Sequence, residues 1–117
     1  MSTEPTIFER IAAREIPADI VFENDRLLAI RDIAPKAPVH LLVFPKEATY
    51  RNVGELSASD PRLLAEIVGT ARTLAEQHSD GQYRLIFNTG ENAGQTVFHV
   101  HAHVLSGTLE EGSLGHE

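Results

Sequence analysis

Residues 98–105 read FHVHAHVL and place three histidines at alternate positions in an otherwise apolar run. Successive side chains of a β-strand point to opposite faces, so this run predicts a strand with His99, His101 and His103 on one face. The other face would carry the apolar residues Phe98, Val100, Ala102 and Val104. Imidazoles that face the protein interior need hydrogen-bond partners and resist protonation. The histidine row, residues 99, 101 and 103, therefore indicates a functional site.

Three interpretations of the histidine row remain open from its spacing. Two imidazoles at i and i+2 can converge on a metal ion, the row can be a nucleophilic or acid–base site, or it can be a chance surface ladder. A metal site needs a further ligand, and His40 is a candidate. Because His40 lies inside the apolar run VHLLVFP (39–45), its spacing fits a site residue and a buried core histidine equally well. His78 lies at a predicted helix end and His116 in a polar tail, so both are expected to be incidental.

The rest of the chain alternates short apolar runs with turn signals and predicts an α+β domain. The expected elements are a short helix that starts near residue 7 and ends before Pro17, a hairpin of strands 19–24 and 26–32, a buried strand at 39–45, a long helix from Ser59 or Asp60 to Asp80, and strands at 83–88 and 97–105. We expect an antiparallel sheet of about five strands with the helices on one side.

Composition limits the classes of function. The 117 residues fit one domain, 1–117, with a polar and mobile tail at 108–117. Ten Lys and Arg against 17 Asp and Glu give a net charge of −7, which disfavours nucleic acid and anionic membranes as partners. The absence of cysteine excludes thiolate metal sites and cysteine nucleophiles. The sequence contains no signal-peptide pattern and no apolar run that could span a bilayer, so we expect a cytoplasmic protein.

The loop before the histidine row, NTGENAGQT (88–96), is suited to an anion. Gly90 and Gly94 let backbone amides approach a phosphate closely, and neutral donors stand beside them at Asn88, Gln95 and Thr96. A plain turn is the alternative, since the glycine spacing and lysine of a P-loop are missing. A phosphate loop next to imidazoles favours phosphoryl or nucleotidyl transfer over a metal hydrolase.

The segment HVHAHVL (99–105) fits the pattern His-h-His-h-His-h-h, where h is hydrophobic, and so resembles the histidine triad (HIT) family. Residues 6–46 and 83–105 resemble the two halves of its Hint branch, which gives a domain core of about 6–107. The resemblance implies a HIT-like fold with a short N-terminal helix and one long helix. It also implies a homodimer that binds purine nucleotides such as AMP or GMP and hydrolyses nucleoside 5′-phosphoramidates without metal or cofactor.

The resemblance also implies roles for single residues. His101 would attack the α-phosphorus to form a nucleotidyl-histidine, His103 would contact the phosphate, and His99 with His40 would orient the nucleophile. Asp32 would hold the ribose hydroxyls. An apolar base pocket would be formed by Phe8, Ile11, Ile16, Ile30 and Ile33, and the phosphate-side positions would be Asn88, Gly94, Gln95 and Thr96. Thr96 is also our candidate proton donor to the leaving nitrogen.

Three alternatives stay open beside this interpretation. The chain could be a nucleotide-binding or sensing module without turnover, a metal-dependent hydrolase, or a dinucleoside polyphosphate hydrolase of the same family. Thr96 stands where the Hint branch commonly has serine, and Ala102 is smaller than the usual hydrophobe between the last two histidines. The tail also lacks the tryptophan- and proline-containing end of eukaryotic relatives, so the choice of substrate stays open, as does the leaving group because of Thr96.

Overall fold

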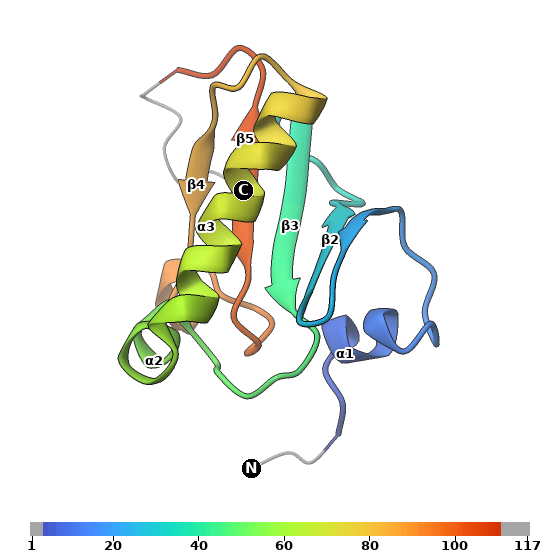
Figure 1. The fold of residues 1–117 in the computed structure, drawn as a ribbon, viewed down its shortest axis with the longest axis vertical. Coiled ribbons are helices and arrows are strands. Elements are labelled where there is room, and N and C mark those ends of the chain that lie inside the picture. Colours follow the sequence, from blue (N-terminus) through green and yellow to red (C-terminus); the bar gives the residue numbers. More distant parts are fainter. Residues whose placement is uncertain (1–3, 111–117) are drawn as a thin grey trace.

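A computed structural model describes residues 4–110 of the chain. Its elements in order are α1 (Ile7–Ala12), β1 (Ile20–Glu23), β2 (Leu27–Arg31), β3 (Val39–Pro45), α2 (Val53–Ser59), α3 (Pro61–His78), β4 (Arg84–Ile86), the 3₁₀ helix η1 (Glu91–Ala93) and β5 (Ala102–Ser106). The five strands form one antiparallel sheet in the order β1-β2-β3-β5-β4 (Figure 1). The predicted α+β class with a five-stranded sheet, a short first helix and one long helix is confirmed.

Local signals explain why these elements start and stop where they do. Asn24 closes the predicted β1–β2 hairpin, because its side-chain oxygen accepts the amide hydrogens of Arg26 at 3.0 Å and Leu27 at 2.8 Å. Asp60 caps α3 by accepting from the amide of Leu63, and Pro61 occupies the first position, where its missing N–H costs nothing. The long helix is therefore confirmed, with the start that the sequence predicts.

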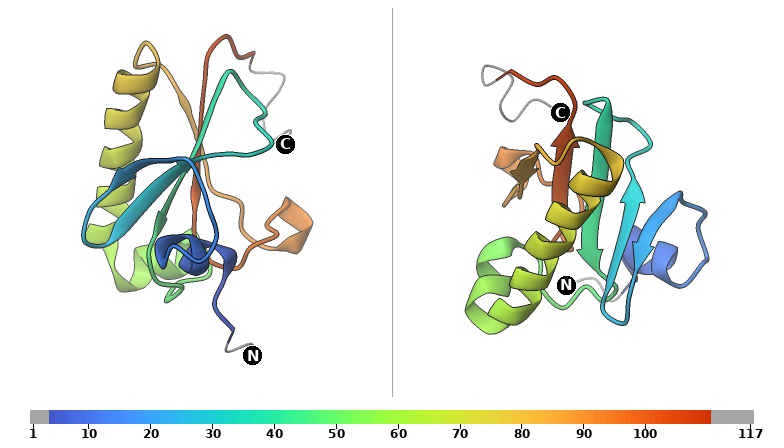
Figure 2. Two further views of the ribbon diagram at one scale, coloured as in Figure 1. Left: turned by 90° about the vertical axis from the view of Figure 1, so that its right-hand side faces the viewer. Right: turned by 45° about the horizontal axis from the view of Figure 1, so that its top comes forward.

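The sheet has a hydrophobic cluster on each face. Alternate residues of β2, β3 and β5, with Leu41 at 0% exposure among them, form one cluster with residues of α3, which runs along one face, and of α2, which lies at the end of α3 (Figure 2). The intervening residues of β2 and β3 pack against α1, through Phe8 and Ile11. The expectation that the helices lie on one side is therefore wrong, because α1 covers the face opposite α3. This second face carries the histidines.

Two further details differ from the sequence prediction. Helix α2 was not predicted, because its seven residues include Gly54 and bury only Leu56, which leaves no helical stripe to detect. Strand β5 begins at Ala102 rather than at 97 or 98, and Phe98 is 46% exposed instead of lying on the core face. The residues before β5 pair with a loop and not with a strand of the sheet, since the amide of Val100 donates to the carbonyl of Tyr50 at 2.9 Å.

Two expectations concern the ends and the membrane. Most of the tail predicted to be mobile, including His116, lies at 111–117, outside the described residues. Among residues 4–110, no helix has the length and apolar character that a bilayer span requires.

Candidate active site

The histidine row and His40 lie together on the face of the sheet that α1 covers. His40 is on β3 and His103 is on β5, its antiparallel neighbour, where Leu42 is paired with His103. His99 is fully buried, His40 and His103 are 4% and 8% exposed, and His101 is half-buried. The predicted alternation is confirmed for these residues, because Val100, Ala102 and Val104 all belong to the opposite cluster.

Both ring nitrogens of His99 have hydrogen-bond partners. Nε2 lies 2.6 Å from the carbonyl oxygen of Pro45, which can only accept, so Nε2 carries the hydrogen. Nδ1 lies 2.6 Å from the hydroxyl of Thr6 and accepts from it. Burial lowers the pKa of His99, opposed by the hydrogen bond to Pro45, so the ring is held neutral in this tautomer.

His101 is oriented by the backbone of the same row. Its Nδ1 lies 2.8 Å from the carbonyl oxygen of His99, and since that oxygen only accepts, Nδ1 carries the hydrogen. The lone pair of the neutral ring is then on Nε2. The ring of Phe8 packs on His101 with centroids 4.9 Å apart, in an edge arrangement that limits rotation of the imidazole. The geometry prepares Nε2 of His101 to act as a nucleophile or a base.

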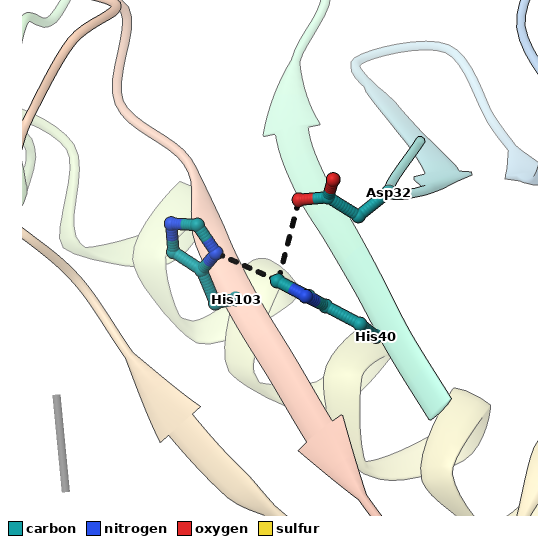
Figure 3. A group of neighbouring side chains, drawn as sticks. All are labelled: Asp32, His40 and His103. Atoms are coloured by element: carbon teal, nitrogen blue, oxygen red, sulfur yellow. Dashed lines mark hydrogen bonds and ion pairs between the residues drawn. The ribbon is translucent and has the colours of Figure 1, made fainter. Parts of the chain in front are cut away.

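His40 links the row to Asp32 (Figure 3). Its Nδ1 accepts from the backbone amide of Lys36 at 3.0 Å, so Nε2 carries the hydrogen and donates to Nδ1 of His103 at 3.0 Å. An Asp32 oxygen lies 3.4 Å from the same Nε2. Because Nδ1 of His103 accepts, its Nε2 carries a hydrogen that can be donated to an anion. The direct bond of His40 is thus to His103, which the sequence assigned to the phosphate.

The same three residues form a group that can hold a metal ion. One ligand atom each of Asp32, His40 and His103 lies within 4.8 Å of the other two. The two imidazole nitrogens already share a hydrogen bond, so a cation would have to displace the hydrogen on Nε2 of His40. The arrangement therefore offers a choice between a cation and a hydrogen-bonded relay, which a chelator experiment separates.

The glycine-containing loop passes beside the row. Gly90 and Gly94 have φ of 90° and 96°, a backbone conformation that other residues rarely adopt. Gln95 is buried and closes the loop, since its side-chain oxygen accepts from the amide of Gly90 and its nitrogen donates to the carbonyls of Arg51 and Val97. The side chain of Gln95 thus shapes the loop. Two further predicted phosphate-side residues flank it, Asn88 half-buried and Thr96 exposed.

Four of the five residues predicted for the base pocket lie in the cluster under α1. Phe8, Ile11 and Ile30 are buried there and Ile16 packs against them. Ile33 is 97% exposed, on the loop that follows Asp32. The four clustered residues are core as well as candidate pocket, whereas Ile33 lies outside that cluster.

Sequence reasoning missed two residues of the site, Thr6 and Glu9. Thr6 caps α1 by accepting from the amide of Glu9, and the Glu9 carboxylate accepts from the amide of Thr6 in return. The spacing Thr-x-x-Glu before an apolar run is the signature of such a capping box and was available in the sequence. The contact of Thr6 with His99, 93 residues away, could not be predicted from the sequence.

Neutral His99 makes a testable contribution to stability. The pKa of His99 in the folded protein lies below its ordinary value of 6.5. As the pH falls below 6.5, His99 is therefore protonated in the unfolded chain before it is protonated in the folded one. Stability should therefore fall on acidification, with His99 adding at most about 1.4 kcal/mol per pH unit. The free energy of unfolding, measured by urea at several pH values from 7 to 5, should fall less steeply with pH for His99→Asn than for the wild type. Equal slopes would contradict this origin.

A five-stranded antiparallel sheet that carries an alternating histidine row beneath a short N-terminal helix defines the class of histidine triad proteins. Comparison with known proteins agrees: a family model described as "Scavenger mRNA decapping enzyme C-term binding" matches residues 5–117. The purine nucleoside phosphoramidase of Escherichia coli is 40% identical over 116 residues, 97% of each chain. The chain belongs to the histidine triad (HIT) family.

Two other relatives extend the comparison. The adenylylsulfatase HINT1 of Arabidopsis thaliana is 38% identical over 110 residues, covering 91% of this chain and 74% of the relative. The solved structure of a HIT family hydrolase from Clostridium thermocellum superposes with a TM-score of 0.84 at 44% identity, covering 92% of this chain and 94% of that one. The fold is thus that of the family.

Proposed function

We propose that this protein is a nucleotide hydrolase that cleaves nucleoside 5′-phosphoramidates through a covalent nucleotidyl-histidine. The observation that carries the proposal is the 2.8 Å hydrogen bond from Nδ1 of His101 to the carbonyl of His99, which leaves the nucleophilic lone pair on Nε2. The names of the relatives support it, since one is a purine nucleoside phosphoramidase and another an adenylylsulfatase. The substrate we infer has a nucleoside monophosphate joined to a leaving group at its α-phosphorus.

The reaction would take two displacements at phosphorus. Nε2 of His101 attacks the α-phosphorus, a P–N bond forms to the imidazole, and the original P–N bond breaks as the leaving amine takes a proton. Water then attacks the phosphorus of the nucleotidyl-histidine and loses a proton to solvent, the bond between phosphorus and Nε2 breaks, and the released nucleoside monophosphate leaves the lone pair on Nε2. The backbone carbonyl of His99 stabilises the positive charge that the ring carries in the intermediate, because Nδ1–H points at it.

The phosphate oxygens would be held by His103 and the loop. His40 fixes the tautomer of His103 so that Nε2–H of His103 can donate to a developing oxyanion. The side chain of Asn88 is our candidate for another donor, whereas the amides of Ala93, Gly94 and Gln95 already donate to carbonyls within the loop and shape it around Gly94. Thr96, an exposed hydroxyl at the end of the loop, is our candidate for the proton that the leaving nitrogen needs.

The nucleoside would lie between α1 and the loop after β2. We propose that Asp32 binds the ribose hydroxyls and that Phe8, Ile11, Ile16 and Ile30 line a pocket for the purine. Ile33 is 97% exposed and would cover the base from the solvent side. Burial of this side chain by a bound base would contribute to the affinity.

The proposal needs no metal, and its test includes a chelator. We expect the wild type to release AMP from adenosine 5′-phosphoramidate equally with and without EDTA, since the proposed nucleophile is a histidine nitrogen and no proposed step uses a metal ion. Diadenosine polyphosphates and adenylyl sulfate, assayed in parallel, distinguish the nearest alternatives. Loss of activity with EDTA and its return with a divalent metal would favour a metal site at Asp32, His40 and His103 instead. No turnover of any of these nucleotides, with AMP still bound, would favour a binding module.

We also propose, from the family resemblance, a single domain that works as a homodimer in the cytoplasm. The sheet ends in β4, a three-residue edge strand, and Val68 on α3 is 39% exposed, so a sheet edge and one partly exposed apolar side chain are available for such an interface. Light scattering at micromolar concentration should give twice the chain mass, and a mass near 12.9 kDa would contradict the dimer. Imaging of a fluorescent fusion tests the location.

A further inference from the structure

The first turn of α1 contacts His99, the buried histidine whose carbonyl orients the proposed nucleophile His101. The hydroxyl of Thr6 accepts from the amide of Glu9 at 3.1 Å and lies 2.6 Å from Nδ1 of His99. Because Nε2 of His99 donates to the carbonyl of Pro45, Nδ1 is an acceptor and the Thr6 hydroxyl is its donor. One hydroxyl therefore satisfies a helix end and a fully buried imidazole at once.

The two groups that hold His99 are themselves tied together. The Glu9 carboxylate accepts from the amide of Thr6 through one oxygen and from the amide of Ala48 through the other, both at 3.1 Å. Ala48 lies in the segment just after Pro45, whose carbonyl accepts the hydrogen on Nε2 of His99. Glu9 thus connects the donor on one side of the His99 ring to the segment that bears the acceptor on its other side.

The His99 ring and its carbonyl belong to one residue, so holding the ring restricts the carbonyl. That carbonyl accepts from Nδ1 of His101 and sets which nitrogen of His101 has the lone pair. The Phe8 ring, also on α1, contacts His99 and His101 with centroids 5.3 and 4.9 Å away. Hydrogen bonding and packing from the same helix turn therefore converge on the two histidines.

We propose that Thr6 is a positioning residue for the nucleophilic histidine and acts through His99; the inference rests on the proposed function of His101. Without the hydroxyl, Nδ1 of His99 becomes a buried acceptor with no donor. Moving the ring hydrogen to Nδ1 gives no relief, because it would leave Nδ1 without an acceptor and the Pro45 carbonyl without a donor. The ring therefore shifts together with its backbone, and the carbonyl that orients His101 loses its fixed place.

Three substitutions at Thr6 separate helix capping from proton donation. Thr6→Val removes both functions at nearly constant shape. Thr6→Asp keeps a good cap for α1 but offers a carboxylate that cannot donate to Nδ1 of His99. Thr6→Ser keeps both. Asp60→Ala is the matched control, since it removes the side-chain cap of α3 on the opposite face of the sheet.

The experiment measures steady-state hydrolysis of adenosine 5′-phosphoramidate and the ¹⁵N shifts of the His99 ring. We expect kcat to fall on the order of tenfold in Thr6→Val and Thr6→Asp with KM changed less than about twofold, because binding groups are untouched. The carboxylate of Thr6→Asp should also move the acidic limb of the pH profile to higher pH, because it favours a charged imidazole. Thr6→Ser should restore kcat.

Two results would overturn the inference. One is an unchanged kcat and unchanged ¹⁵N shifts of His99 in Thr6→Val. The other is an equal loss of kcat in Asp60→Ala, which would reduce the effect to general stability. The ¹⁵N shifts report the Thr6–His99 bond without any turnover, so a wild type that hydrolyses none of the nucleotides would refute the proposed function and still leave the bond tested.

Discussion

His101→Ala is expected to lower kcat for adenosine 5′-phosphoramidate by about 10⁴-fold, because it removes the atom that forms the covalent bond to phosphorus. Residual turnover would come from the phosphate donors alone, as in other enzymes that lose a nucleophile. The side chain is only half-buried, so the fold should persist. Binding of AMP, measured by calorimetry, should change little, since Nε2 of His101 acts in the transition state.

The matched control is His78→Ala. His78 is also a histidine, but it lies at the end of α3, with its ring 3.5 Å from Arg31, and has no part in the row. Its loss should leave kcat within about twofold of the wild type, as for surface substitutions away from a site. Acid quenching of the wild type during turnover should trap a nucleotidyl adduct that peptide mapping assigns to His101. More than a tenth of wild-type activity in His101→Ala would reject this residue as the nucleophile.

The sequence predicted the elements whose signals are local. The continuous apolar run VHLLVFP and the cap Asp60 before Pro61 are each readable within a few residues, and β3 and α3 lie where these signals place them. Helix α2 carried no such signal, since Leu56 is its one buried residue. The side of the sheet on which α1 packs could not be predicted from the sequence either. Phe8 and Ile11 of α1 pack against residues on one face of β2 and β3, and no local pattern indicates which face that is.

The candidate site divides in the same way. The histidine row was visible because its period is that of a strand, whereas the tautomer of each ring depends on contacts distant in the chain. His99 is held by Thr6 and Pro45, 93 and 54 residues away, and His40 meets His103 across 63 residues. Residue types indicated the chemistry, but only the packing of α1 and the β3–β5 register determine which nitrogen of each ring is available to react.

Phe44→Ala is expected to cost about 3–5 kcal/mol of folding stability, the usual range for deleting a buried phenylalanine. Phe44 is fully buried on β3, stacks on Phe8 with centroids 4.3 Å apart, and meets the edge of His99 at 5.8 Å. Since domains of this size are stable by about 5–15 kcal/mol, much of that margin would be lost. Urea unfolding should show a lower midpoint with an unchanged slope.

The position of Phe44 gives this substitution a second effect that a core residue on the other face lacks. Ile67→Ala empties the cluster under α3, where Ile67 is fully buried, and should cost about 2–5 kcal/mol. At a temperature where both variants stay folded, Phe44→Ala should also lower kcat, because the cavity lies under Phe8 and His99, whereas Ile67→Ala should not. Equal kcat in the two variants would mean that the cluster under α1 supports only the fold. A difference would show that packing under α1 holds the histidine row in its reactive arrangement.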